Sequence, residues 1–140
     1  MTTRSLQMRL VSREETPVLF LRTVDDVATF APLWERLEGL VGLRGRRFYG
    51  AFFELRNEYW VCVEATPDLD ATALGLEVGA LPGGQYLRTR LRGEPPLVYE
   101  RIGPAFHVME TEATSDPTRP GIEFYRARDV IDCLMPLARS

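Results

Sequence analysis

The sequence predicts an α+β domain in which a strand–helix–strand–strand unit (βαββ) occurs twice, giving one antiparallel sheet with helices on a single face. Two internal echoes predict the duplication. One match is between Phe20-Leu21-Arg22-Thr23 and Tyr86-Leu87-Arg88-Thr89. The other, at almost the same offset in sequence, is between Trp34-Glu35-Arg36-Leu37 and Tyr99-Glu100-Arg101-Ile102. Self-similarity at a fixed offset is the signature of a repeated structural unit. The first repeat covers about residues 6–66 and the second about 74–138. Together they form a single domain, 1–140.

The first repeat opens with one long, interrupted strand, because Leu6–Ser12 and Pro17–Val24 are rich in β-branched and apolar residues on either side of a polar bend. A helix then runs from near Thr29 to about Val41, with apolar residues at three-to-four spacing. Gly42 is a typical helix stop. The strands that close this repeat as a hairpin are Arg47–Leu55 and Glu58–Ala65.

The second repeat follows the same order. Its first strand, Leu76–Leu91, is interrupted at Leu81-Pro82-Gly83-Gly84, which is typical of a bulge or tight bend. Pro95-Pro96 opens a helix through Ile102, and we expect Gly103-Pro104 to end or kink it, because both residues are poor in helix interiors. The strands of the last hairpin are Ile122–Arg126 and Val130–Leu137.

Composition narrows the function classes. A net charge of -3 with scattered basic residues argues against direct nucleic-acid binding, which needs a concentrated basic face. The sequence contains no apolar run typical of a signal peptide or a membrane span, so we expect a cytoplasmic protein without a membrane partner. Cys62 and Cys133 are then expected to be thiols at equivalent strand positions. With His107 as the single histidine, we expect neither a metal site nor a cofactor.

The junction between the two repeats is the expected ligand site, because grooves at such junctions commonly bind small molecules. Glu123 is the sharpest candidate there. It lies in an apolar strand on the same face as Tyr125, and Phe52 is its counterpart in the first repeat. A carboxylate at a position where the repeat has an aromatic must be paired, protonated or turned toward a cavity. The pattern alone leaves a groove-facing and a solvent-facing Glu123 equally open.

Several short motifs together resemble the GyrI-like effector-binding domains, which also form the drug-sensing half of some bacterial transcription regulators. The motifs that carry this resemblance, spread over nearly the whole chain, are Pro32-Leu33-Trp34-Glu35, Phe48-Tyr49-Gly50, Pro82-Gly83-Gly84-Gln85-Tyr86, Ile122-Glu123-Phe124-Tyr125, Val130-Ile131-Asp132 and Met135-Pro136-Leu137. The resemblance implies a duplicated βαββ fold with a ligand between the two helices, and a central glutamate that approaches lipophilic cations among aromatic rings. The positions that match are Glu123, Tyr125, Tyr86 and Trp34.

The resulting hypothesis is a stand-alone module that binds, sequesters or senses amphipathic aromatic compounds, including cationic ones of the multidrug type. The expected ligand-binding residues are Glu123, Tyr125, Tyr86, Trp34, Tyr49, Phe52, Trp60 and Phe106. The resemblance also implies an alternative, a hydrolase of electrophilic cyclopropane-bearing molecules with Glu123 as general base. A third alternative, inhibition of a topoisomerase, is disfavoured by the small net charge. The sequence leaves open whether the partner is a second copy of the chain or a separate regulator protein.

Overall fold

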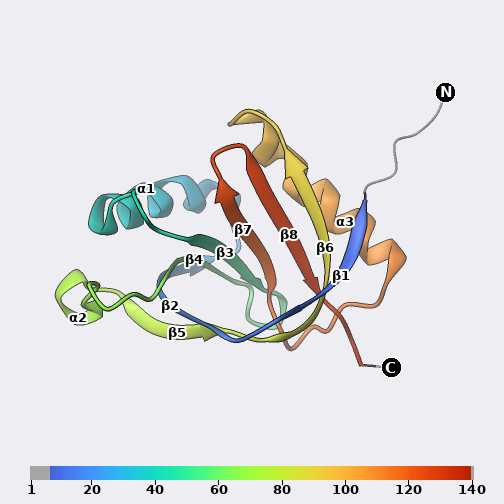
Figure 1. Cartoon of the computed structure of the whole chain (residues 1–140), viewed down its shortest axis with the longest axis horizontal. Helices are drawn as coiled ribbons and strands as arrows, with labels where there is room; N and C mark the ends of the chain where they lie inside the picture. Colours follow the sequence, from blue (N-terminus) through green and yellow to red (C-terminus); the bar gives the residue numbers. More distant parts are fainter. Residues whose placement is uncertain (1–6, 140) are drawn as a thin grey trace.

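The computed structural model describes residues 7–139, so Leu6, at the start of the first expected strand, lies outside the described residues. Eight strands form one antiparallel sheet in the order β1-β6-β8-β7-β3-β4-β2-β5 (Figure 1). The strands are β1 (Met8–Arg13), β2 (Thr16–Val24), β3 (Phe48–Phe53), β4 (Glu58–Glu64), β5 (Glu77–Leu81), β6 (Gly84–Arg92), β7 (Gly121–Ala127) and β8 (Val130–Pro136). The helices are α1 (Phe30–Val41), α2 (Ala71–Leu74) and α3 (Ile102–Glu112), with 3-10 turns η1 (Val27–Thr29), η2 (Glu54–Arg56) and η3 (Leu97–Arg101).

The predicted fold class is confirmed: β2-α1-β3-β4 and β6-α3-β7-β8 are two βαββ units in one antiparallel sheet. The two units meet where β3 pairs with β7. There Ala51 faces Ile122, with the Gly50–Glu123 and Phe52–Gly121 pairs on either side. This register relates Phe52 to Glu123 by a pseudo-twofold axis. The outer strands are exchanged between the units, because β1 pairs with β6 and β5 pairs with β2.

The two long helices cover the same face of the sheet, which we call the helix face. On α1, Leu37 and Val41 are buried against β2 and β4, and on α3, Ala105 and Met109 are buried against β6 and β8. Figure 1 shows α1 over one half of the sheet and α3 over the other. Burial of an apolar side chain of this size contributes about 1.5–3 kcal/mol. The hydrophobic effect therefore holds each helix against the strands of its own repeat.

The opposite face, which we call the helix-free face, carries a core of its own. Strand side chains alone build this cluster, and no residue of α1 or α3 belongs to it. Its buried residues are Val18, Phe20, Tyr49, Ala51, Trp60, Cys62, Leu81, Tyr86, Ile122, Phe124 and Leu134. The central strands are therefore buried on both sides.

The second helix corrects a prediction. The sequence placed a helix at Pro95–Ile102 with a stop at Gly103-Pro104, whereas residues 97–101 form the 3-10 turn η3 and α3 begins at Ile102. Gly103 and Pro104 thus occupy its first turn. Backbone N–H groups in the first turn of a helix have no intrahelical acceptor, so a proline there removes no hydrogen bond. Gly103-Pro104, which the sequence pattern placed at the end of a helix, therefore lies at the start of α3.

The cysteines correct a second expectation. Both are buried free thiols. Cys62 packs on the helix-free face and Cys133 on the helix face, so they do not occupy equivalent positions. The strand register explains the difference: Leu21 pairs with Val61, whereas its echo Leu87 pairs with Met135, which makes Tyr59 the counterpart of Cys133.

No helix within residues 7–139 is long and apolar enough to cross a membrane.

Candidate ligand-binding site on the helix face

The carboxyl group of Glu123 lies at the middle of the helix face. Its Oε1 accepts two hydrogen bonds, each 2.7 Å long, from the hydroxyl groups of Tyr59 and Tyr125. Tyr125 follows two residues later in β7 and therefore points to the same side of the sheet. Tyr59 comes from β4, so its side chain crosses β3 to reach Glu123. The two repeats are thus joined through one carboxylate oxygen.

Gly50 makes this crossing possible. It pairs directly with Glu123 across β3 and β7. A Cβ atom at position 50 would overlap the Tyr59 hydroxyl and Glu123 Oε1, and would lie 3.0 Å from Tyr59 Cζ. A glycine inside a strand commonly marks such a close approach. Any larger residue would displace the acceptor or one of its donors.

Aromatic rings surround the two tyrosines. Phe30 of α1 stacks on Tyr59 with ring centroids 3.8 Å apart. Tyr125 makes edge contacts with Trp34 of α1 at 5.2 Å and with Tyr99 of η3 at 6.2 Å. Both repeats therefore contribute rings around the glutamate. Phe30, Trp34, Tyr99 and Tyr125 all remain at least partly exposed.

Burial sets the protonation behaviour of this group. Desolvation raises the pKa of Glu123 above its ordinary value, and hydrogen bonds from Tyr59 and Tyr125 partly oppose this rise. Desolvation, followed by the nearby Glu123 charge, raises the pKa of both tyrosines well above 10. The phenols therefore remain protonated donors at neutral pH.

The second carboxylate oxygen of Glu123 is free. Both tyrosine hydroxyls bond Oε1, and Oε2 has no hydrogen-bond donor within residues 7–139. Within residues 7–139, Thr89 Oγ1 is the single polar side-chain atom that is both fully buried and without a hydrogen-bond partner. Oε2 is therefore not completely enclosed. Glu123 is partly exposed, so Oε2 can be reached by a ligand from between the surrounding aromatic rings.

The structure brings five of the eight expected site residues to the helix face. Glu123 and Tyr125 are in direct contact, and Trp34 packs on Tyr125. Phe52 packs against the α1 cluster. Phe106 of α3 lies over β7, 3.2 Å from where a Cβ of Gly121 would be.

The other three expected residues, Tyr49, Trp60 and Tyr86, lie on the helix-free face, and this placement corrects the prediction that they share a site with Glu123. Trp60 stacks on Phe20 with ring centroids 3.7 Å apart, and the Tyr86 hydroxyl donates to the Pro82 carbonyl at 2.6 Å. A shift of one residue along a strand exchanges its two faces. Tyr59, rather than Trp60, therefore reaches the glutamate.

Sequence reasoning missed Tyr59, Gly50 and Phe30. Every residue of β4 from Tyr59 to Val63 is buried, so no alternation of polar and apolar residues marks the helix face. A usable signal was Gly50, because an isolated glycine within a strand indicates a close contact. No group of three or more His, Cys, Asp or Glu side chains suited to a metal ion occurs among the residues that the structure describes.

No family model and no curated protein matches the sequence. Solved structures match the fold over nearly the whole chain. An integron cassette protein from Vibrio cholerae is 15% identical, with a TM-score of 0.76, 94% of this chain and 95% of that chain covered. SAV2435, solved bound to tetraphenylphosphonium, is 16% identical, with a TM-score of 0.70 and coverage of 95% and 94%.

Two further structures extend the comparison. The C-terminal domain of EcmrR is 11% identical, with a TM-score of 0.61 and coverage of 96% and 99%. A hydrolase from Listeria innocua is also 11% identical, with a TM-score of 0.55 and coverage of 97% and 94%. At these identities the structural similarity establishes the fold of the chain only. Its function has to be argued from the geometry of the site.

We predict that Gly50→Ala lowers the free energy of unfolding by about 1–3 kcal/mol, because the new methyl group displaces the Tyr59 hydroxyl or the Glu123 carboxyl. Gly39→Ala is the matched control, since a Cβ there meets nothing within 4 Å on exposed α1. The control is expected to stabilise the protein by about 0.5–1 kcal/mol. Urea denaturation measures both, and effects of the same sign would contradict the crowding at Gly50.

We also predict a pH dependence of stability from Glu123. Its folded pKa lies above the ordinary 4.5, so the folded state holds the proton more tightly. The stabilisation is present below the unfolded pKa and is lost as pH rises through the folded pKa. Wild type should therefore lose stability relative to Glu123→Gln between about pH 4 and the folded pKa. Denaturation of both proteins across this range measures it, and a wild type that gains stability relative to Glu123→Gln as pH rises would refute it.

Proposed function

We propose that this chain is a GyrI-like binding module that sequesters or senses amphipathic aromatic cations at the helix face. The observation that carries the proposal is the unpaired, accessible Oε2 of Glu123 among partly exposed rings. Two phenol donors fix the carboxyl group through Oε1 and leave Oε2 for the ligand. A site built in this way favours a cation over a neutral molecule of the same shape.

The surrounding rings add to this preference. The face of an aromatic ring attracts a cation by about 0.5–2 kcal/mol, and more strongly where water is excluded. Trp34, Tyr99 and Tyr125 offer such rings from both repeats. An apolar ligand surface would pack on the rings while its positive charge approached Glu123.

The shared fold supports the same class of ligand. SAV2435 has this fold and was solved with the lipophilic cation tetraphenylphosphonium. The C-terminal domain of EcmrR also has this fold, and EcmrR has been solved in complex with DNA. We propose that the present chain acts on its ligand alone or signals through a second copy or a separate regulator.

We predict that Glu123→Gln weakens tetraphenylphosphonium binding by about 1.5–3 kcal/mol, because the substitution removes the charge that faces the cation. Binding of triphenylphosphine oxide, a neutral molecule of related shape, should hardly change. Isothermal titration calorimetry of both compounds measures the difference.

Glu110→Gln is the control for this experiment, because Glu110 is exposed on α3 and its removal changes the net charge equally. It should leave both affinities unaltered. Equal losses for the two compounds in Glu123→Gln, or a loss in Glu110→Gln of the same size, would show that position 123 does not recognise the charge.

Hydrolysis is the second candidate function. The observation that favours it is the raised pKa of Glu123 beside two phenol donors, since a carboxylate with a raised pKa is a better general base. A Listeria innocua hydrolase shares the fold. In this scheme Glu123 would take a proton from water as the water oxygen bonds to a cyclopropane carbon. The electron pair of the broken C–C bond would pass to the conjugated carbonyl of the substrate, and the protonated Glu123 would return the proton there.

Product analysis separates the two functions. After overnight incubation with an aromatic compound that carries an electrophilic cyclopropane, we expect the compound to be recovered unchanged, because binding alone forms no product. Mass spectrometry of the mixture measures this outcome. Product that forms with wild type and not with Glu123→Gln would replace the binding role with a catalytic one.

A further inference from the structure

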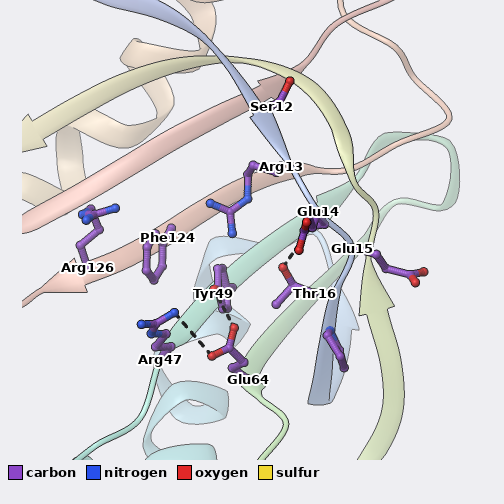
Figure 2. A pocket seen from close by; sticks show the side chains of 11 residues that line it. Ser12, Arg13, Glu14, Glu15, Thr16, Arg47, Tyr49, Glu64, Phe124 and Arg126 are labelled. Carbon is purple, nitrogen blue, oxygen red and sulfur yellow. Dashed lines mark hydrogen bonds and ion pairs between the residues drawn. The ribbon is translucent and has the colours of Figure 1, made fainter.

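A pocket of about 420 Å³ opens on the helix-free face, on the side of the sheet away from Glu123. It lies between the bend that joins β1 to β2 and the central strands β3 and β7 (Figure 2). Its aromatic floor consists of Tyr49, which is 1% exposed, and Phe124, which is 9% exposed. These residues are cross-strand neighbours whose rings stack with centroids 4.7 Å apart and planes 16° apart.

Three arginines surround this floor. The guanidinium carbon of Arg13 lies 5.8 Å from the Tyr49 ring centroid and 5.6 Å from that of Phe124. Arg126 lies 5.4 Å from the Phe124 ring from the other side. Arg47 reaches the same end of the pocket, as Figure 2 shows. The aromatic floor is thus bordered by positive charge.

Arg13 is the arginine whose charge is not neutralised. Within residues 7–139 its guanidinium has no carboxylate within ion-pair distance, and its polar neighbour is the Tyr49 hydroxyl, whereas Arg47 pairs with Glu64 at 3.8 Å and Arg126 with Asp132 at 3.4 Å. The Arg13 guanidinium lies at nearly equal distances from the centroids of two stacked rings, so it sits beside their edges and not over a face. The N–H groups of Arg13 that do not face Tyr49 remain for a ligand.

The acidic residues of the pocket lie apart from Arg13. Asp132, which pairs with Arg126 from outside the pocket lining, also binds Arg90 at 2.7 Å. Glu64 also accepts a hydrogen bond from the Tyr49 hydroxyl at 3.4 Å. Glu14 and Glu15, at the bend, form no ion pair with these arginines among the described residues, and Figure 2 shows the Glu15 carboxylate directed away from them. Positive charge is therefore in excess where the rings lie.

We infer that this pocket is a second binding site, which takes a small planar aromatic anion. The carboxylate or phosphate group of the ligand would accept hydrogen bonds from Arg13 and Arg126, and its ring would pack against the exposed part of Phe124. Charge-assisted hydrogen bonds to guanidinium groups are among the strongest in proteins. The pocket volume also falls within the range of small-molecule sites, about 300–1,000 Å³. This site does not depend on the proposed role of Glu123.

Titration with 2-naphthoate, followed by its fluorescence, tests the inference. We expect saturable binding to wild type, and Arg13→Gln should weaken it at least about tenfold, the loss expected from removing a charged hydrogen-bond donor. Arg13→Lys should give an intermediate affinity, since it keeps the charge and loses the planar fork. Arg44→Gln is the matched control, because it removes one exposed arginine in the loop before β3, and it should change the affinity less than about twofold.

Further arms of the experiment locate the site and define the ligand. Naphthalene-2-carboxamide, which is neutral, should not bind detectably, and 2-naphthyl phosphate compared with 2-naphthoate distinguishes phosphate from carboxylate preference. Glu123→Gln and saturating tetraphenylphosphonium should both leave the 2-naphthoate affinity unchanged. Circular dichroism checks that Arg13→Gln folds, and Arg126→Gln provides a second variant if it does not.

Three outcomes would overturn the second site. The first is no binding of either anion, and the second is equal binding of the neutral amide. The third is displacement of 2-naphthoate by tetraphenylphosphonium together with insensitivity to Arg13→Gln and Arg126→Gln, which would place the anion on the helix face. The first two outcomes leave the proposed role of Glu123 untouched. The third is separated from it by the effect of Glu123→Gln on tetraphenylphosphonium binding, so the two proposals fail separately.

Discussion

The pairing of β3 with β7 is the constraint on which the rest of the site depends. It sets Gly50 directly opposite Glu123, and the missing side chain at position 50 lets Tyr59 reach across a strand to the carboxyl group. One carboxylate oxygen thereby connects β4 of the first repeat with β7 of the second. A buried acceptor with two donors is costly to rearrange, because each lost hydrogen bond leaves a desolvated polar atom. The geometry around Glu123 is therefore a property of the junction of the two repeats.

Local sequence patterns were sufficient for the architecture. The echo of Phe20–Thr23 in Tyr86–Thr89 predicted the repeat, and strand alternation placed Glu123 and Tyr125 on one face, because both signals involve residues close in the chain or copied as a block. The start of α3 was missed for a specific reason. Glycine and proline break a helix in its interior and are well tolerated in its first turn, and sequence alone does not say which of these positions Gly103-Pro104 occupies.

Which residues form the site could not be predicted without knowing how the strands pair with one another. Side chains from β3, β4 and β6 reach one face or the other according to cross-strand register, and a shift of one residue exchanges Tyr59 for Trp60. Central strands buried on both faces carry no polar alternation that would settle the question. The cysteines show the same difficulty: their spacing within the tails of the two repeats appeared equivalent, whereas strand pairing offsets them by three residues.

The same two strands build both candidate sites. In β3, Gly50 faces the helix side and Tyr49 the helix-free side, and in β7, Glu123 and Phe124 are divided in the same way. Adjacent residues of a strand point to opposite faces, so a single sheet presents a carboxylate among rings on one side and arginines beside rings on the other. The net charge of -3 describes neither surface, because each face groups its own charged side chains around its rings. The face that a residue reaches, and so which of the two candidate sites it joins, is therefore set by whether its position along the strand is odd or even.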